Sequence, residues 1–265
     1  MSYGEAAILG FVQGMTEFLP VSSSAHLKLV PWLAGWNYQG LAYDIALHWG
    51  TLLALAAFFW KDWLNLLAGA AGRGTEEDKG LFWRIFWATA PAGFAGLLLE
   101  DYAEAAFGLP ARTAAALIVF GVLMGWADRS GAKTLGREGL TMRNCLFIGC
   151  AQALALIPGV SRSGITITTG LLLGLKREEA ARFSFLLSTP IVFAAGALKL
   201  RDLAGTSFGG PFWVGIAVSA LSGYAAIAFL LRFTARRSLQ PFAVYRVLLG
   251  LACLGVLYLS GPKGL

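Results

Sequence analysis

The segment at residues 13–26 gathers side chains that could carry out acid–base and nucleophilic chemistry. It reads Q-G-M-T-E-F-L-P-V-S-S-S-A-H, which puts Gln13 and Glu17 four residues apart on one helical face. His26 ends the segment, and an imidazole titrates near neutral pH, which suits proton transfer. One serine of the preceding run is expected to cap a helix, which leaves another as a nucleophile once it is activated. The run consists of Ser22, Ser23 and Ser24.

The segment at residues 158–166 has the features of an anion site. It reads P-G-V-S-R-S-G-I-T and places Arg162 between Ser161 and Ser163 at the expected start of a helix. Unpaired N–H groups at a helix start attract phosphate, and a guanidinium binds phosphate oxygens in a two-pronged geometry. Helix capping is an alternative role for the two serines, but capping does not explain an arginine in an apolar region. The other candidate ligands here are Gly164 and Thr166.

Together, the two segments offer the groups that phosphoryl transfer requires. One supplies a carboxylate and hydroxyls, and the other supplies positive charge for an anionic group. Glu17, helped by Gln13, could also bind a divalent cation, Mg²⁺ or Ca²⁺, because both ions prefer oxygen ligands. One carboxylate is a weak metal site, so the phosphates of a substrate would have to complete it. His48 has Asp44 four residues before it, and a hydrogen bond along the helix is favoured there over direct catalysis.

The composition of the chain places these polar residues inside a membrane. Hydrophobic residues make up 57% of the 265 residues and charged residues 14%, and the mean hydropathy is +0.65, outside the usual soluble range. A charged group at membrane depth is costly, so Glu17 and Arg162 are expected to have a function. Spans of roughly 20 mainly apolar residues are expected at about 42–60, 85–99, 113–127, 183–198, 212–231 and 242–260.

The distribution of charge favours a membrane protein over a nucleic-acid-binding protein. The net charge of +6 comes from Lys and Arg in short loops between the apolar spans, and the positive-inside rule accounts for such loops. We therefore expect no nucleic-acid partner. The first apolar segment follows no basic region and no small-residue cleavage site, so no removable signal peptide is expected.

Two regions, 5–34 and 144–175, are expected to form re-entrant hairpins of two half-length helices each. A proline and a serine-rich turn interrupt both regions. Proline breaks a helix, and irregular backbone at membrane depth must be enclosed by protein or water. Setting Gly10 on Gly149 also aligns the two serine-containing turns, which predicts an internal duplication. Three ordinary spans follow each hairpin, so the second copy enters the membrane from the opposite face.

The predicted fold is an all-α polytopic membrane protein with an inverted-topology repeat, six transmembrane helices and two re-entrant hairpins. A single membrane domain, 1–265, contains repeat one at 1–140 and repeat two at 141–265. Most Lys and Arg residues fall in loops that this topology places on one side of the membrane. The opposite side keeps few basic residues, so both termini are expected to face outward. These few are Arg112, Lys199, Arg201 and Lys263.

The motifs resemble those of the bacterial undecaprenyl-diphosphate phosphatase family, which is linked to bacitracin resistance. The resemblance extends to A-D-R at 127–129, A-R-F-S-F-L-L at 181–187 and Y-R-V-L-L-G at 245–250. It implies removal of the terminal phosphate from undecaprenyl diphosphate, with a divalent cation, to recycle the carrier lipid for cell-wall synthesis. It also implies a multi-pass protein of the bacterial cytoplasmic (inner) membrane with its active site toward the periplasm. The implied partners are a polyprenyl diphosphate and the lipid bilayer, and a homodimer is compatible with the resemblance.

The resemblance also assigns roles by position. The acidic motif falls on Gln13 and Glu17, the serine–histidine pair on Ser23 and His26, and the phosphate-binding arginine on Arg162. Where relatives carry glutamate at the first of these positions, this chain has lost one charge for a metal ion. Histidine at position 48, where many relatives carry glutamine, is a second departure.

The resulting hypothesis is that Ser23, assisted by His26, attacks the terminal phosphorus while Arg162 and a cation near Glu17 stabilise the charge. Direct attack by His26 or by water stays open. The main rival is a secondary transporter or flippase of a phosphorylated lipid, because inverted repeats with broken helices are typical of transporters. The convergence of a hydroxyl, an imidazole, a carboxylate and a guanidinium favours the enzyme, because a carrier needs no nucleophile.

Overall fold

The structure is a computed structural model that describes residues 1–37, 40–200 and 209–260. Within these ranges every regular element is a helix. The α-helices are α1 (Tyr3–Phe18), α2 (Ser23–Ala34), α3 (Leu41–Phe58), α4 (Trp60–Ala70), α5 (Glu76–Phe107), α6 (Pro110–Ser130), α7 (Met142–Gln152), α8 (Arg162–Leu172), α9 (Arg177–Leu198), α10 (Gly210–Thr234) and α11 (Gln240–Ser260). Two short 3₁₀ helices are η1 (Arg137–Gly139) and η2 (Ala153–Leu156).

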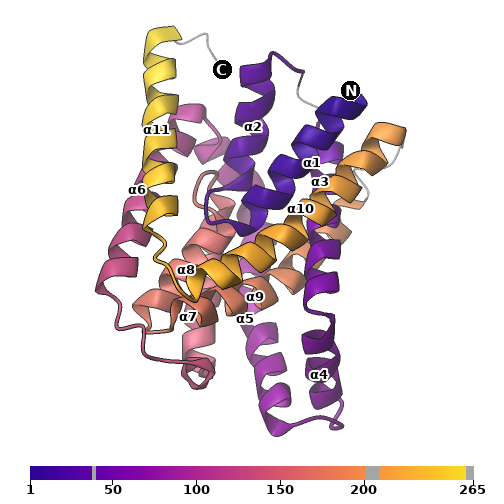
Figure 1. Ribbon diagram of the computed structural model, residues 1–265, viewed down its shortest axis with the longest axis vertical. Helices are drawn as coiled ribbons and strands as arrows, with labels where there is room; N and C mark the ends of the chain where they lie inside the picture. Colours follow the sequence, from indigo (N-terminus) through magenta and orange to yellow (C-terminus); the bar gives the residue numbers. More distant parts are fainter. Residues whose placement is uncertain (38–39, 201–208, 261–265) are drawn as a thin grey trace.

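A helix occupies each of the expected apolar spans, and the chain is a polytopic membrane protein. Among the described residues, α5, α6, α9, α10 and α11 are long and apolar enough to cross a membrane, and α3 reaches that length only together with α4. The two meet at a bend of 75°, although neither proline nor glycine, the usual causes of a kink, lies between Phe58 and Trp60. The start of α1 and the end of α11 lie at the same end of the molecule, with α4 at the other end (Figure 1).

A break divides the helical structure of each interrupted region at its predicted serine-rich turn. In the first, α1 ends at Phe18 and α2 begins at Ser23, and in the second, α8 begins at Arg162 after α7 and η2. The residues just before α2 and α8 are Ser22 and Ser161, with φ angles of 76° and 69°. A positive φ is uncommon outside glycine, so these aligned serines share an unusual backbone turn.

The first helix of each interrupted region packs closely against a helix from the other half of the chain. α1 lies along α10, and α7 lies along α5 (Figure 1). At Gly10 of α1, an added Cβ would lie 2.5 Å from the carbonyl oxygen of Gly215. At the aligned Gly149 of α7, an added Cβ would lie 2.0 Å from the carbonyl oxygen of Ala88. Glycine at both positions therefore lets the paired helices approach closely.

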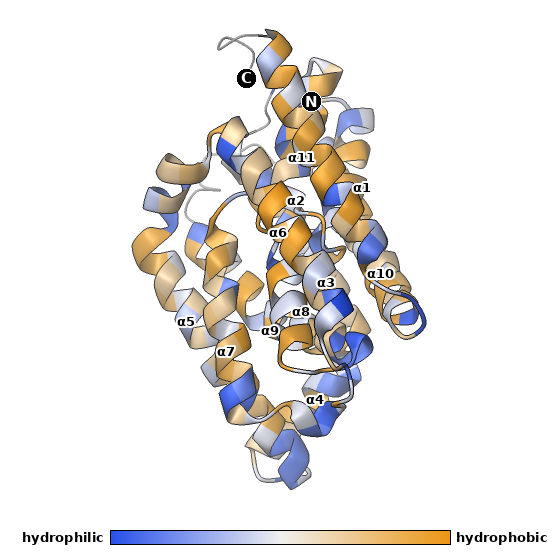
Figure 2. Ribbon diagram, turned by 90° about the vertical axis from the view of Figure 1, so that its left-hand side faces the viewer, coloured by the Kyte–Doolittle hydropathy of each residue, from blue (hydrophilic) through white to orange (hydrophobic). Residues whose placement is uncertain are grey.

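Apolar side chains cover much of the outer surface, as a membrane protein requires. Figure 2 shows hydrophobic residues along most of the helices and hydrophilic residues gathered near the α4 end. Phe94 of α5 is 66% exposed and Leu221 of α10 is 74% exposed, and a bilayer would cover such surfaces. In the interior, Phe18 packs edge-to-face against Phe185 with ring centroids 5.5 Å apart, which ties α1 to α9.

Candidate active site

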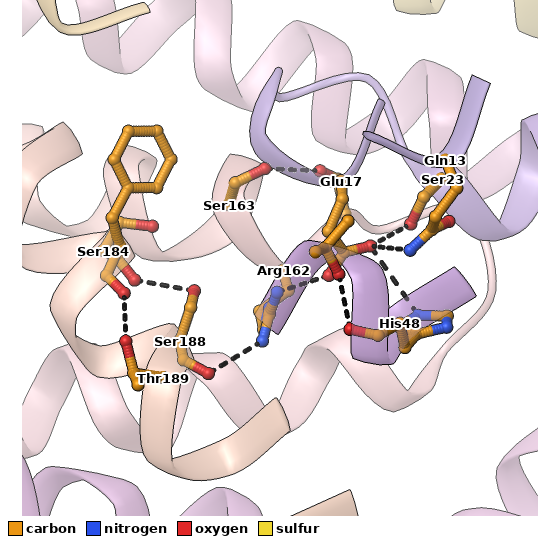
Figure 3. A network of polar contacts seen from close by, with 12 residues as sticks. Gln13, Glu17, Ser23, His48, Arg162, Ser163, Ser184, Ser188 and Thr189 are labelled. Atoms are coloured by element: carbon orange, nitrogen blue, oxygen red, sulfur yellow. Dashed lines mark hydrogen bonds and ion pairs between the residues drawn. The ribbon is translucent and has the colours of Figure 1, made fainter. Parts of the chain in front are cut away.

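The breaks of the two interrupted regions meet inside the protein (Figure 3). The guanidinium of Arg162, in the first turn of α8, forms an ion pair with Glu17 of α1, and the two side chains are only 14% and 7% exposed. Arg162 also donates a hydrogen bond to the carbonyl oxygen of Ser188 at 3.3 Å. Ser163 donates to the carbonyl oxygen of Leu19 at 3.3 Å. Two segments that are distant in the sequence thus form one cluster of polar groups.

The carboxylate of Glu17 is the centre of this cluster (Figure 3). Its Oε1 faces Arg162, and its Oε2 accepts hydrogen bonds from Ser23 Oγ at 2.6 Å and from Gln13 Nε2 at 3.2 Å. The Nε2 atom of His48 lies 3.7 Å from the same oxygen. A buried carboxylate is tolerated when opposite charges and donors surround it, and both oxygens of Glu17 have such partners.

The ring of His26 is held by two groups other than Ser23. Its Nδ1 lies 2.8 Å from the carbonyl oxygen of Ser22, and its Nε2 lies 2.7 Å from the hydroxyl of Tyr245. A carbonyl can only accept, so Nδ1 carries the hydrogen, and in a neutral ring Nε2 accepts from Tyr245. The two rings stack with centroids 5.7 Å apart. The expected assistance of Ser23 by His26 has no direct hydrogen bond behind it, because Ser23 donates to Glu17 instead.

His48 takes part in the cluster as well as in its own helix. Its Nδ1 lies 2.8 Å from the carbonyl oxygen of Asp44, which is the hydrogen bond along the helix that the spacing predicts. Its other ring nitrogen faces Glu17. The sequence favoured the first contact over a role at the site, whereas the structure shows that one imidazole makes both.

The serines at the two helix starts make different contacts. Ser161 Oγ accepts a hydrogen bond from the N–H of Gly164 at 3.2 Å, so this serine caps α8. Ser22 makes no capping bond of this kind, and its hydroxyl pairs with that of Ser24 at 3.2 Å. The hydroxyls of Ser161 and Ser163 lie 3.3 Å apart. Capping therefore accounts for one of the candidate phosphate ligands and leaves the others available.

The hydroxyl of Thr166 is bonded to α9 and to its own helix. Its Oγ1 lies 2.6 Å from Ser184 Oγ and donates to the carbonyl oxygen of Arg162 at 2.8 Å. These bonds join α8 to α9 and orient the turn that carries Arg162. Thr166 thus supports the site by holding the turn of α8 that carries Arg162.

The chain matches the family model described as bacitracin resistance protein BacA over residues 6–252. The chain belongs to this family. The undecaprenyl-diphosphatase of Pelotomaculum thermopropionicum is 49% identical to it, over 95% of this chain and 96% of that protein. Those of Geobacter sulfurreducens and Gemmatimonas aurantiaca are 49% and 48% identical, over 97% of this chain and 99% and 98% of their own lengths. The family resemblance drawn from the motifs is confirmed.

One buried residue of this BacA family member was not singled out from its sequence. Arg246 of α11 is 0% exposed and donates to the carbonyl oxygens of Pro20 at 3.4 Å, Gly159 at 2.9 Å and Val160 at 2.7 Å. It therefore binds both breaks at once. The signal was present, because an arginine inside an apolar span is as costly as the charges of Glu17 and Arg162.

The residues around Glu17 fit a divalent cation only in part. The amide oxygen of Gln13 is buried without a hydrogen-bond partner in the described part of the chain, and its side chain contacts Glu17. No group of three or more His, Cys, Asp or Glu residues in the described ranges is arranged to hold a metal ion. Mg²⁺ takes about six oxygen ligands, so this pair fits a cation that is shared with phosphate groups.

Proposed function

We propose that this chain hydrolyses undecaprenyl diphosphate to undecaprenyl phosphate and inorganic phosphate, as the names of its relatives indicate. The observation that carries the proposal is the pair of contacts made by the carboxylate of Glu17. One of its oxygens accepts a hydrogen bond from Ser23, and the other pairs with Arg162. A hydroxyl held against a carboxylate is suited to attack, and the adjacent guanidinium is suited to bind the attacked phosphate. A lipid carrier would need the anion site but would not need the activated hydroxyl.

In the proposed reaction, Ser23 is the nucleophile and Glu17 accepts its proton. The Oγ–phosphorus bond forms as the bond between the terminal phosphorus and the bridging oxygen breaks, and undecaprenyl phosphate leaves. Water then attacks the phosphorus of the phosphoserine, the Oγ–phosphorus bond breaks, and inorganic phosphate is released. Ser23 regains a proton from Glu17, whose carboxylate takes up the proton that the water loses. The 2.6 Å contact of Ser23 Oγ with Glu17 Oε2 makes this carboxylate the nearest general base. Direct attack by water would use the same carboxylate, and attack by His26 would first require its release from Tyr245.

The ion pair with Arg162 makes the ability of Glu17 to accept a proton depend on whether substrate is bound. Before substrate binds, the guanidinium neutralises Glu17. A diphosphate is a stronger bidentate acceptor, and transfer of the guanidinium to the phosphate leaves the carboxylate without its cation. Glu17 then becomes a better proton acceptor at the time when Ser23 must lose its proton.

The starts of α2 and α8 supply further phosphate ligands. Helix N-termini present free N–H groups and a partial positive charge to an anion, and both starts lie at the meeting point of the breaks. The hydroxyls of the adjacent serines extend the same site. The proposed substrate ligands are the hydroxyls of Ser22, Ser24 and Ser163, together with the hydroxyl hydrogen of Ser161, whose oxygen accepts from the N–H of Gly164.

A divalent cation, Mg²⁺ or Ca²⁺, would be held by Glu17 and the amide oxygen of Gln13 together with phosphate oxygens. Such an ion neutralises charge on the phosphates and helps to orient them. With such an ion bound, Ser23 would still attack and Arg162 would still bind the phosphate. Glu17 would take the proton of Ser23 only through the oxygen that contacts Ser23, Oε2, and its other oxygen would be the one available to the ion.

We also propose that the two halves, 1–140 and 141–265, are inverted repeats within one membrane domain, with re-entrant hairpins at 5–34 and 144–175. The shared positive φ of Ser22 and Ser161 supports this. The exchanged packing of α1 on α10 and of α7 on α5 also supports it. The spans in this topology are α3 with α4, α5, α6, α9, α10 and α11.

We propose that the protein lies in the bacterial cytoplasmic membrane with both termini and the active site toward the periplasm. The end of the molecule that carries α4 (Figure 1) is followed in the sequence by Arg73, shortly after α4, and by Arg84 in the first turns of α5. These basic residues favour a cytoplasmic location for that end. Two of the few basic residues expected on the opposite side, Arg201 and Lys263, lie outside the described residues. A homodimer stays a prediction.

Phosphate release from the purified protein in detergent tests the proposed function. Given undecaprenyl diphosphate and Mg²⁺, the wild-type chain should release inorganic phosphate, and a chelator should lower the rate. Ser23→Ala should lose activity. Thr16→Ala, which removes a hydroxyl bonded only along its own helix, should keep it and serves as the matched control. A folded wild-type protein that releases no phosphate would refute the proposal and favour a carrier.

A further inference from the structure

Arg246 is a buried cation whose hydrogen-bond acceptors are all neutral. Its three acceptors are backbone carbonyl oxygens, one from the first break and two from the second. Its Nε has no hydrogen-bond partner, and no carboxylate lies within ion-pair distance of it among the described residues. A buried charge without a counter-ion is costly. The cost is lowered if the negative charge of a bound diphosphate lies near the guanidinium, even without direct contact.

Neighbouring glycines make room for this guanidinium directly beside the phosphate site. An added Cβ at Gly164, in the first turn of α8, would lie 2.5 Å from Arg246 Nη1. An added Cβ at Gly121 of α6 would lie 3.0 Å from Arg246 Cβ. The positive charge of Arg246 therefore adjoins the same helix turn that carries Arg162.

The carbonyls that Arg246 binds also set the direction of the neighbouring amides. A trans peptide is planar, with its N–H opposite its carbonyl. Because the carbonyls of Gly159 and Val160 point to Arg246, the N–H groups of Val160 and Ser161 point away from it. The N–H of Val160 is bonded to the carbonyl oxygen of Ile157 at 3.2 Å, whereas the N–H of Ser161 has no backbone acceptor in the described part of the chain. It stands beside the free N–H groups at the start of α8.

We propose that Arg246 is a positioning residue for the phosphate site. It fastens the two breaks to each other, turns the Ser161 amide and the start of α8 toward the diphosphate, and adds positive charge from the side of α11. This inference rests on the proposed function, because it takes the diphosphate as the bound anion. It separates the two arginines by role: Arg162 touches the phosphate, and Arg246 acts through the backbone that surrounds it.

Three substitutions separate the charge of Arg246 from its packing. Arg246→Met keeps most of the volume without charge or donors, Arg246→Gln keeps donors without charge, and Arg246→Lys keeps charge with fewer donors. Loss of one preorganised donor at a developing charge lowers kcat by roughly 10²–10³-fold. Arg246→Met no longer orients the Ser161 amide, so its kcat should be about 100-fold or more below that of the wild type. The kcat of Arg246→Lys should be about tenfold higher than that of Arg246→Gln, because lysine carries a positive charge and glutamine does not.

The matched control is Arg177→Met. Arg177 forms an ion pair with Asp128, with 2.5 Å between Nε and Oδ1, and neither residue belongs to the Glu17 cluster. This variant should lower the thermal midpoint without changing kcat. Each variant is assayed at a temperature at which it is folded, and the shift of its thermal midpoint by inorganic pyrophosphate is measured separately. Pyrophosphate should raise the midpoint of the wild type and of Arg177→Met, and should have at least threefold less effect on Arg246→Gln.

The outcomes distinguish this inference from the proposed function. Equal kcat for the Lys and Gln variants, with equal pyrophosphate shifts, would overturn the role of Arg246 even if Arg246→Met does not fold. A wild type without phosphate release would overturn the proposed hydrolysis, while the pyrophosphate shifts would still decide whether Arg246 supports an anion site. If every folded Arg246 variant has the kcat of the wild type, Arg246 contributes to stability alone and the inference is wrong.

Discussion

Removing Arg162 should lower stability and activity by separate routes. Arg162→Met leaves the carboxylate of Glu17, which is only 7% exposed, without its cation. Removing one partner of a buried ion pair costs about 3–5 kcal/mol. Ser23 and Gln13 still donate to the other carboxylate oxygen, so we expect the lower end of this range, about 3 kcal/mol in the free energy of unfolding. Glu17→Gln should cost a similar amount, because it strands the guanidinium beside the carbonyl of Ser188.

The double variant Glu17→Gln/Arg162→Met separates the two effects. It removes both charges, and replacing a whole buried pair is often close to neutral. We expect its free energy of unfolding within about 1 kcal/mol of the wild type, well short of the sum of the single changes. Its activity should not recover, because an arginine at a transferred phosphoryl group contributes about 10³–10⁵-fold and the proton acceptor for Ser23 is also gone.

Unfolding of the purified proteins in mixed detergent and denaturing detergent gives the stabilities, and phosphate release gives the activities. The control is Thr16→Ala, on the same helix as Glu17. Near-normal turnover by folded Arg162→Met would refute the role of the guanidinium. A double variant that loses as much stability as the two single variants combined would show that the pair is not coupled in the way its contact indicates.

Three further substitutions test other contacts. Gln13→Glu adds a carboxylate beside Glu17 and should lower the Mg²⁺ concentration needed for half-maximal phosphate release by roughly tenfold; an unchanged requirement would argue against a shared cation. Both amide atoms of Gln152 are buried without partners among the described residues, so Gln152→Leu should raise the free energy of unfolding by about 1 kcal/mol, and a loss would reveal a hidden partner. Gly149→Ala puts a Cβ 2.0 Å from the carbonyl oxygen of Ala88 and should cost about 1–3 kcal/mol in thermal or denaturant unfolding, a cost that would be absent if α7 can shift.

The positions of the chemically active segments could be predicted from the sequence, because two energetically unfavourable features, a charged residue and a broken helix, occur together there. Charged residues at membrane depth need partners, and broken helices need enclosure. Glu17 and Arg162 each lie within one helical turn or so of a break, so their mutual pairing satisfies both requirements. The same physical reasoning applied to the apolar run around Arg246 predicts a third buried charge, although the acceptors of that charge are backbone groups that sequence spacing does not reveal.

The choice of partners within the site depends on helices that are distant in the sequence. His26 is close to Ser23 along the chain, yet its ring turns to Tyr245 of α11. Ser23 turns to Glu17 across the break instead. Such directions depend on how α2 packs against α11 and α1, and local spacing carries no information on that packing. The 75° bend between α3 and α4 is a similar case, because no proline or glycine marks its position in the sequence.

Trapping of the covalent intermediate tests the proposed chemistry most directly. Wild-type protein is mixed with undecaprenyl diphosphate labelled in its terminal phosphate, quenched in acid within one turnover, digested and mapped by mass spectrometry. Labelled phosphoserine at Ser23, absent from Ser23→Ala and reduced in Glu17→Gln, is the predicted result. Label on His26, or full turnover by Ser23→Ala with no labelled peptide, would contradict attack by Ser23 with Glu17 as its base.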